Sequence, residues 1–164
     1  RDTLHCTYFD FLSAIDWLPS PFGRDMDAQE DLVVSGAGPK DPGPIEQGYA
    51  GGETRFQVIG RVFSISDGLG VHLKTDLPDD DLRVDTWTNH FRGANWHERE
   101  CYEMFGVEFT GHPNLVKLYL PADFQGNPLR KDFPLLSRRV RPWPGIVDVE
   151  PMPGGDDDEE GEGE

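Results

Sequence analysis

The residues that could do chemistry gather in one short segment. His97, Glu98, Glu100 and Cys101 lie within five consecutive positions, and His112 follows a little further along the chain. Imidazole, carboxylate and thiolate groups bind zinc and transfer protons in enzymes. However, the sequence reads HEREC, whereas a zinc helix of the HExxH type places two histidines on one face. A metal-dependent hydrolase that uses His97, Glu100 and His112 is therefore the weaker hypothesis.

A structural helix explains the same residues better. Asn95 stands where an N-cap is expected, and Glu98 follows it at the capping-box spacing. Gly106 is placed to end the helix in the left-handed conformation. Cys101 would lie on the apolar side, where a free cysteine behaves as a small hydrophobic residue. We predict a helix that uses these residues for structure, with no catalytic, metal-binding or cofactor-binding residue.

The other chemical motifs are incomplete. The glycine pairs at 36–38 and 68–70 complete neither GxGxxG nor GxxxxGK[ST], so nucleotide binding is not predicted for this chain. The sequence contains no GxSxG elbow. Cys6 and Cys101 stand far apart without a CxxC, which excludes an iron–sulfur or zinc-ribbon framework within the chain and fits a reducing cytoplasm.

Composition and charge narrow the class of protein further. The 164 residues carry a formal net charge of -16, and seven of the carboxylates lie in the last nine residues. This excess of negative charge repels a phosphate backbone, so nucleic acid is not an expected partner. No run approaches the roughly 18 apolar residues of a membrane-spanning helix. Because the sequence starts at Arg1 and enters an apolar pattern at once, we expect the native N-terminus to lie upstream.

The helix must be positioned by a sheet, and hydrophobic periodicity predicts its strands. Residues 7–13 have helical spacing, and 14–18 read as a short strand stopped by prolines. Residues 55–65 are rich in β-branched and aromatic residues, while apolar and polar residues alternate along 71–77. These two stretches predict an antiparallel hairpin with its first strand in a central position. A further short strand is expected at 107–109.

The predicted fold class is α+β: a small antiparallel sheet with helices packed on it, followed by an extended C-terminal arm. Residues 1–120 would form the domain, with a surface insertion at 19–54 that is rich in proline, glycine and acidic residues. Residues 121–150 hold too many large apolar side chains for a free linker, so we predict an arm that wraps a partner. The acidic tail at 151–164 is predicted to be disordered.

One long motif carries a family resemblance. It consists of GANWHERECYEMFG at 93–106, then Gly111-His112-Pro113, Lys117, and PLRKDFPL at 128–135. This pattern closely resembles the signature of the 30-kilodalton subunit of the proton-translocating NADH:quinone oxidoreductase, respiratory complex I. The sequence departs mildly from this signature at three positions. Cys101 stands where an aliphatic residue is more usual, Glu103 replaces an aspartate, and Asn127 replaces a histidine.

The resemblance implies a cofactor-free structural subunit of the peripheral arm of such a complex. Its implied neighbours are the quinone-site subunit related to nickel hydrogenases and the subunit with the terminal iron–sulfur cluster. FMN, iron–sulfur clusters and quinone would lie on other subunits, where electrons pass from NADH to quinone, coupled to proton translocation. The chain would be a non-catalytic member of this hetero-oligomer, held through the complex at the cytoplasmic side of the bacterial cell membrane.

The resemblance and the charges together give the candidate interface residues. We expect Glu98, Arg99 and Glu100 to make charge-assisted hydrogen bonds, within the domain or across an interface, that fix the helix. Arg99 is also spaced for an i,i+4 ion pair with Glu103. The full set, in which the last three residues would anchor the arm, is Asn95, Glu98, Arg99, Glu100, Gly106, His112, Pro113, Lys117, Pro128, Leu129, Arg130, Lys131 and Asp132.

Two other assignments stay open on the sequence. The same scaffold would serve in a relative of complex I, such as a membrane-bound hydrogenase or a ferredoxin-fed quinone reductase, and the motif separates these poorly. An adaptor unrelated to respiration would explain the arm and the tail, but it would leave the long motif to coincidence. Neighbouring subunits that bind NADH and flavin would distinguish complex I from its relatives.

Overall fold

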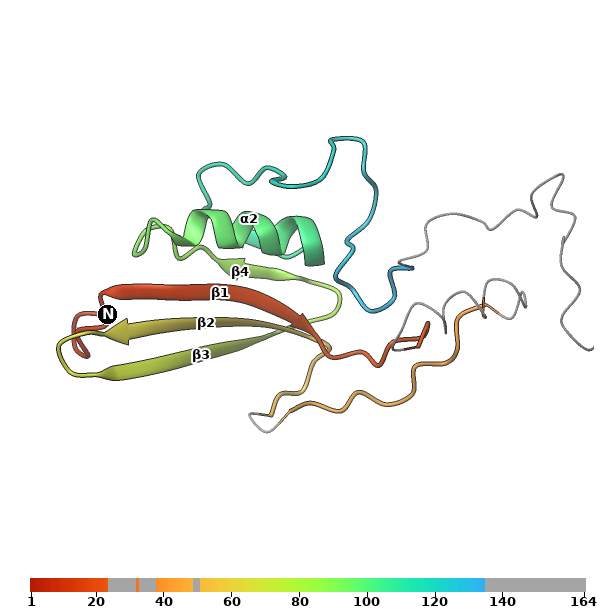
Figure 1. Ribbon diagram of the computed structural model, residues 1–164, viewed down its shortest axis with the longest axis horizontal. Helices are drawn as coiled ribbons and strands as arrows, with labels where there is room; N and C mark the ends of the chain where they lie inside the picture. Colours follow the sequence, from red (N-terminus) through yellow and green to blue (C-terminus); the bar gives the residue numbers. More distant parts are fainter. Residues whose placement is uncertain (24–31, 33–37, 49–50, 135–164) are drawn as a thin grey trace, which may run out of the picture.

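A computed structural model describes residues 1–23, 32, 38–48 and 51–134 of the protein. In chain order its elements are β1 (Tyr8–Asp16), β2 (Phe56–Ser64), β3 (Leu69–Leu77), β4 (Arg83–Asp85), α2 (Ala94–Phe105) and β5 (Glu108–Thr110). Figure 1 shows α2 above a sheet of β1, β2 and β3, with β4 between the helix and the sheet. This arrangement confirms the predicted α+β class.

The central hairpin has the predicted form. β2 pairs with β3 in antiparallel register from Phe56 opposite Leu77 to Ser64 opposite Leu69. The strand order β1-β2-β3 places β2 in the centre, as its continuous run of apolar residues predicted. The turn between the strands uses Gly68 with φ of 62°, a left-handed conformation that glycine adopts without steric cost.

The first element is a strand, so the helix predicted at 7–13 is wrong. β1 pairs antiparallel with β2 along its whole length, with a register shift between Phe9 and Phe11. Its buried residues Leu12, Ala14 and Asp16 alternate with more exposed ones, which is the period of a strand. The apolar spacing fits a helix equally well over so short a run. Pairing with the central strand decides between them.

The helix begins one residue before the predicted cap. Gly93 is the N-cap residue of α2, and no side chain caps the helix, so the role predicted for Asn95 is wrong. Asn95 already lies inside the first turn, where its side chain cannot accept from the second or third helical N–H. The C-terminal prediction is confirmed, because Gly106 has φ of 78° and its N–H donates to the Tyr102 carbonyl at 3.0 Å.

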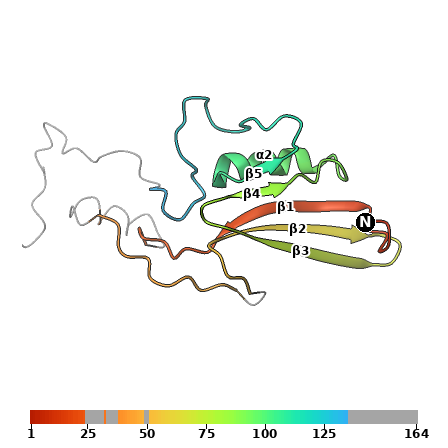
Figure 2. The same cartoon turned by 180° about the vertical axis from the view of Figure 1, so that it is seen from behind.

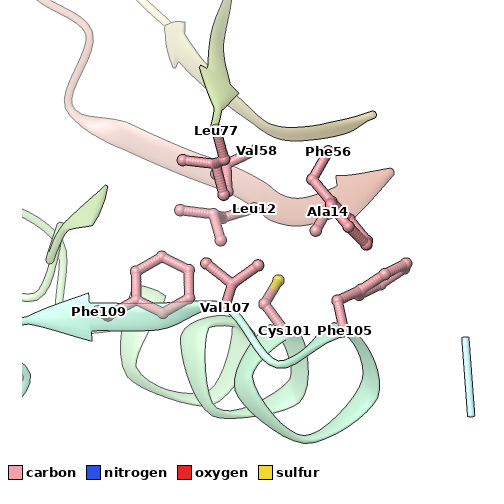
Figure 3. Close-up of a cluster of buried hydrophobic side chains, with 9 residues drawn as sticks. All are labelled: Leu12, Ala14, Phe56, Val58, Leu77, Cys101, Phe105, Val107 and Phe109. Carbon is pink, nitrogen blue, oxygen red and sulfur yellow. The ribbon is translucent and has the colours of Figure 1, made fainter. Parts of the chain in front are cut away.

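The core lies between α2 and the sheet. Its buried members, shown in Figure 3, are Leu12, Ala14, Phe56, Val58, Leu77, Cys101, Phe105, Val107 and Phe109. Cys101 is 1% exposed, which confirms its prediction as a core residue. Phe109 belongs to β5, which pairs in parallel with β4. The sequence predicted a strand near β5 at 107–109, but it gave no sign of β4, which has only three residues.

Some predicted segments fall outside the described residues. These are the tail at 151–164, residues 135–150 of the arm, and 24–31, 33–37 and 49–50 of the insertion. The two ends of the insertion lie close together, because the Trp17 N–H donates to the Arg55 carbonyl at 2.9 Å. In the described part of the chain, no helix is long and apolar enough to cross a membrane.

Candidate functional site

The predicted interface residues lie on α2 and on the segment that follows β5. Figures 1 and 2 show this segment, coloured from green to blue, leaving β5 near the start of α2, running along the helix and turning back at its C-terminal end. The motif therefore folds into one unit, which consists of α2 and the segment 111–134 that runs back along it, called here the returning segment. The side chains of the motif determine how the two are joined.

Glu98 ties the first half of α2 to the segment after β4. Its side chain is fully buried and accepts hydrogen bonds from Thr86 Oγ1 and from the Trp87 N–H, both at 2.6 Å. Burial raises the pKa of Glu98, and the two hydrogen bonds only partly oppose this. The predicted capping role of Glu98 is wrong, because its carboxylate binds these two residues upstream of the helix and not the backbone N–H of the cap.

His112 and Asn95 join the start of α2 to the loop after β5. The buried His112 ring accepts the Asn114 N–H at Nδ1 over 3.0 Å, so the ring proton is on Nε2. Nε2 then donates to the Asn95 carbonyl at 3.3 Å and lies 4.0 Å from Glu98 Oε2. Asn95 thus contributes its backbone to this contact. Pro113, which is exposed, borders a surface hollow with Asn95.

Arg99 holds the middle of the returning segment. Its Nε donates to the Val116 carbonyl at 3.0 Å, and Nη2 donates to the Lys117 carbonyl at 3.4 Å. Lys117 in turn donates from Nζ to the Phe124 carbonyl at 2.6 Å. The predicted ion pair between Arg99 and Glu103 is wrong, because Arg99 points to these carbonyls and the Glu103 carboxylate has other partners.

Glu103 binds three consecutive backbone N–H groups. Oε2 accepts from Leu118 and Tyr119, both at 2.8 Å, and Oε1 accepts from Leu120 at 2.7 Å. Burial opposes the charge of this carboxylate, but the three N–H donors outweigh it and hold the pKa of Glu103 below its usual range. The folded structure therefore favours the charged form of Glu103, and its carboxylate fixes the backbone of the loop at 118–120.

The returning segment also satisfies the last carbonyls of α2, which have no partner inside the helix. Asn127 Nδ2 donates to the Glu103 carbonyl at 2.9 Å, and the Leu129 N–H donates to the Met104 carbonyl at 3.1 Å. Arg130 Nε donates to the Phe105 carbonyl at 2.6 Å. The guanidinium also places a positive charge at the C-terminal end of the helix, where it is favourable.

An ion cluster centred on the buried Asp16 attaches the arm to the sheet. Arg55 forms a two-pronged pair with Asp16, at 2.8 and 2.7 Å, and contacts Asp132 at 3.0 Å. The Lys131 N–H donates to Asp16 at 2.8 Å. Burial opposes the charge of Asp16, but Arg55 and the N–H groups of Lys131 and Leu18 prevail and lower its pKa. The start of the arm is thus fixed to its own domain.

The remaining motif residues have less defined roles. Pro128 and Leu129 line a hollow of about 450 Å³ between residues 18–23 and the arm. Gly106 faces Arg130 and Asn127 so closely that a methyl group there would clash with both. Glu100 is half-buried on α2, and the structure gives its side chain no hydrogen bond within the described residues.

Asp16, Arg55 and Thr86 are site residues that the sequence patterns did not single out. Asp16 ends an apolar strand, and its partner Lys131 is 115 positions away. Thr86 stands just before a tryptophan in a loop. The one usable signal is Asp16 itself, since a carboxylate on the inward side of a strand requires a buried cation or several N–H donors.

The geometry gives the candidate reactive groups structural partners. His97 Nδ1 lies 3.1 Å from the Leu12 carbonyl of β1, whereas the His112 ring contacts Asn95 and Asn114. Burial, followed by the nearby Glu100 and Glu98, raises the pKa of the Cys101 thiol to about 12, which leaves it a poor nucleophile. In residues 1–23, 32, 38–48 and 51–134, no group of three or more His, Cys, Asp or Glu could hold a metal ion.

This geometry defines a class of protein: an α+β domain in which the segment after the sheet clamps the helix α2. The model of one family, "Respiratory-chain NADH dehydrogenase, 30 Kd subunit", matches residues 2–139. The chain belongs to this family.

Individual relatives agree with the family model. The chain is 44% identical over 88 residues to the C/D subunit of NADH-quinone oxidoreductase from Cronobacter sakazakii, and 41% identical over 91 residues to that from Shewanella oneidensis. The matched parts cover 54% and 56% of this chain but only 15% of each relative. A solved structure described as "Nqo5 of the trypsin-resistant fragment (1-134)" has a TM-score of 0.47 and 24% identity, covering 70% of this chain and 69% of that one.

Proposed function

We propose that this chain is a cofactor-free, non-catalytic subunit of the peripheral arm of an NADH:quinone oxidoreductase. The observation that carries the proposal is the set of hydrogen bonds that join α2 to the segments before and after it, called here the clamp. The charged motif residues Glu98, Arg99, Glu103 and Arg130 all bond to other parts of the same chain, not to one another around an open cavity. Their hydrogen bonds hold α2 and the returning segment in one fixed arrangement, so the surface that the two present has a fixed shape.

A fixed surface is what an electron-transfer complex requires from a supporting subunit. A quinone site formed between subunits depends on positions held to a fraction of an ångström, and such precision needs a rigid support behind the site. The four side chains join α2 to segments that precede and follow it. We therefore assign the helix and its returning segment as the support for neighbouring redox subunits.

The partners follow from the same proposal. The chain would contact the quinone-site subunit related to nickel hydrogenases and the subunit with the terminal iron–sulfur cluster. FMN, iron–sulfur clusters and quinone would belong to other subunits, which carry electrons from NADH to quinone and translocate protons. The chain would reach the cytoplasmic side of the bacterial cell membrane through these partners.

The test is affinity purification of the tagged full-length protein from its native membranes, with mass spectrometry and an assay of NADH-driven quinone reduction. Flavin, iron–sulfur and membrane subunits together with inhibitor-sensitive activity would support the proposal. Hydrogenase or ferredoxin-linked subunits in their place would assign the chain to a relative of complex I. A lone protein with stoichiometric metal would overturn the proposal.

A paired substitution tests the clamp itself. Arg99→Ala removes the hydrogen bonds to the Val116 and Lys117 carbonyls, and we expect the isolated protein to stay soluble while less complex is assembled. Arg92→Ala is the matched control, because Arg92 is exposed just before the helix and its side chain makes no hydrogen bond or ion pair in the described structure. Normal assembly and activity in Arg99→Ala would contradict the supporting role of the clamp.

A further inference from the structure

A chain of two threonine hydroxyls connects the buried carboxyl of Glu98 to a hollow at the surface. Thr86 Oγ1 lies 2.6 Å from Glu98 Oε2, and Thr88 Oγ1 lies 2.8 Å from Thr86 Oγ1. Glu98 is 0% exposed, whereas Thr88 is half-buried in the described structure and lines the hollow that Asn95 and Pro113 also border. This hollow has a volume of about 410 Å³, which is room for several water molecules. Hydrogen bonds therefore lead from the interior carboxyl to the surface.

The partners of Glu98 determine which of its oxygens can take a proton. Oε1 accepts the Trp87 N–H at 2.6 Å, and a backbone N–H cannot turn round to become an acceptor. A proton on Oε1 would therefore point at another proton. Oε2 faces the Thr86 hydroxyl, which can either donate or accept. Protonation of Glu98 therefore takes place at Oε2.

The Thr86 hydroxyl makes all its hydrogen bonds when Glu98 is charged. It donates to Glu98 Oε2, and it accepts both the Thr88 N–H at 3.1 Å and the Thr88 hydroxyl. One donated and two accepted bonds are the full capacity of a hydroxyl group. The charged state is therefore completely hydrogen-bonded at this residue.

Every one of these contacts is kept when Glu98 is protonated. The new O–H on Oε2 donates to Thr86 Oγ1, which still accepts the Thr88 N–H and now donates to Thr88 Oγ1. Thr88 then directs its own O–H away from Thr86. Because the two hydroxyls only reverse their direction, protonation avoids the cost of a buried polar group without a partner.

The groups around Glu98 leave it as the acceptor of an arriving proton. Burial raises the pKa of Glu98, and the nearby His112 has a smaller, opposite effect. His112 Nδ1 already accepts the Asn114 N–H, so the ring has no free nitrogen for a second proton. Burial also raises the pKa of the Cys101 thiol on α2, which therefore keeps its proton. Other titratable or charged groups of the adjacent elements are half-buried or exposed and make no hydrogen bond to Glu98 in the described structure: Asp10, Asp85, His90, Arg92, His97, Glu100 and Glu108.

We propose that Thr86 and Thr88 form a proton relay between the surface hollow and Glu98, which is thereby a reversible proton-binding site in the folded chain. A proton from water binds Thr88 Oγ1 while Thr88 passes its own proton to Thr86 Oγ1, and Thr86 passes its own to Glu98 Oε2. Three O–H bonds break and three form, so one proton enters and both hydroxyls remain neutral. Release follows the same steps in reverse. The relay lies within this chain and does not depend on the proposed function.

A pH titration of the full-length chain by carbon-13 NMR tests the proton-binding site. The side-chain carboxyl signal of Glu98 is assigned by its absence in Glu98→Gln. We expect this signal to report protonation while the amide spectrum is still that of the folded chain. Protonation that occurs only together with unfolding would overturn the proposal.

Two valine substitutions should change the titration in opposite directions. Thr88→Val leaves the Thr86 O–H without an acceptor in the protonated state, so Glu98 should bind its proton about tenfold less tightly. Thr86→Val removes a donor that stabilises the carboxylate, so Glu98 should bind its proton more tightly. A change of the same sign in both variants would overturn the reversal of the hydroxyls, because altered packing alone gives no reason for opposite signs.

Two further variants are the controls. Thr88→Ser keeps the hydroxyl and should titrate as the wild type does. Thr75→Val removes an exposed hydroxyl of β3 that makes no hydrogen bond in the described residues, and it should leave Glu98 unchanged. Thermal unfolding checks that each variant is folded. If Thr86→Val does not fold, the comparison of Thr88→Val with Thr88→Ser still decides the outcome.

The rate of proton arrival separates the relay from opening of the fold. After a rapid drop in pH, the infrared band of a protonated carboxyl group, identified by its absence in Glu98→Gln, follows Glu98. We expect this band to form about tenfold more slowly in Thr88→Val than in the wild type and Thr88→Ser, because without the relay the proton waits for local unfolding. Equal rates in all three proteins would overturn the relay.

Discussion

Arg130 closes the C-terminal end of α2 by donating from Nε to the Phe105 carbonyl at 2.6 Å, across 25 positions of sequence. The same guanidinium lies over the Phe56 ring at 5.2 Å, so one side chain of the arm contacts both the helix and the central strand. The stability of the helix end is therefore coupled to the position of the arm.

Arg130→Ala should destabilise the protein by about 1 to 3 kcal/mol, the usual cost of losing a partly buried hydrogen bond from a charged group. The substitution leaves the Phe105 carbonyl without its donor and removes the positive charge from the helix end. Urea unfolding at neutral pH measures the change. Arg92→Ala, an exposed arginine near the other end of α2, should change the free energy of unfolding by less than about 0.5 kcal/mol. Equal effects of the two substitutions would contradict the coupling.

Glu103→Gln should reduce the sensitivity of the protein to acid. The folded-state pKa of Glu103 lies below its ordinary value of 4.5, so the carboxylate contributes stability at pH above that value. This contribution is lost as the pH falls through the folded-state pKa. The variant lacks it at every pH, and its NH₂ group faces backbone N–H donors from which it cannot accept. We expect a cost of about 1 to 3 kcal/mol at pH 7 that shrinks on acidification.

Unfolding titrations between pH 7 and pH 3 test this sign. The difference between wild type and Glu103→Gln should narrow as the pH falls, because the wild-type carboxylate becomes protonated and loses its advantage. Asp16→Asn should behave in the same direction, since the pKa of Asp16 is also lowered. A difference that stays constant over this range would show that the charge of Glu103 is not what the three N–H groups bind.

Glu98→Gln should show the opposite pH dependence. Burial raises the pKa of Glu98 above its ordinary value of 4.5, so the folded protein holds the proton of this group more tightly than the unfolded chain does. The stability of the wild type relative to the variant is then greatest at pH below 4.5 and declines as the pH rises through the folded-state pKa. The neutral amide can still accept the Trp87 N–H and donate to Thr86 Oγ1, so Glu98→Gln should fold.

Comparison with Glu98→Ala separates charge from hydrogen bonding. The alanine variant leaves the Trp87 N–H and the Thr86 hydroxyl without their acceptor and opens a cavity, at a cost of about 2 to 5 kcal/mol. The glutamine variant should lie within about 1 kcal/mol of wild type near pH 7. If glutamine cost as much as alanine, the negative charge of Glu98 would be required in the folded state.

Local sequence patterns predicted the parts of the fold whose partners are close in sequence. The β2 and β3 hairpin and the glycine end of α2 depend on neighbouring residues, and both were found. β1 was misassigned at its start because Tyr8, Phe11, Leu12 and Ile15 satisfy the helical period over two turns. Its pairing partner β2 lies beyond the insertion, so no local pattern could favour the strand.

The sequence singled out some residues that hold α2 in place, but not the partners that they contact. Glu98 and Arg99 were singled out for charge-assisted hydrogen bonds, yet the capping and ion-pair partners expected for them lay within one turn of the helix. The observed partners are Thr86 and the Val116 carbonyl, which the chain brings close only after folding. A carboxylate can be matched to backbone N–H groups, as in Glu103, only when the path of the loop is known.

Gly60→Ala should displace the Trp87 ring from the sheet. A methyl group at Gly60 would overlap the edge of the indole, which packs against the flat backbone of β2. Trp87 also contacts Phe9 edge to face, at 6.4 Å between ring centroids, so its displacement would disturb the aromatic cluster over β1. We expect a loss of about 1 to 3 kcal/mol, the usual cost of overpacking, and a change in the near-ultraviolet circular dichroism spectrum.

Gly68→Ala is the matched control for this last prediction. Gly68 lies in the hairpin turn with φ of 62° and has open space around it, so alanine there should cost about 1 kcal/mol through backbone strain alone. Its aromatic circular dichroism should match that of wild type. Identical spectra for the two variants would show that the indole does not depend on the missing side chain at Gly60.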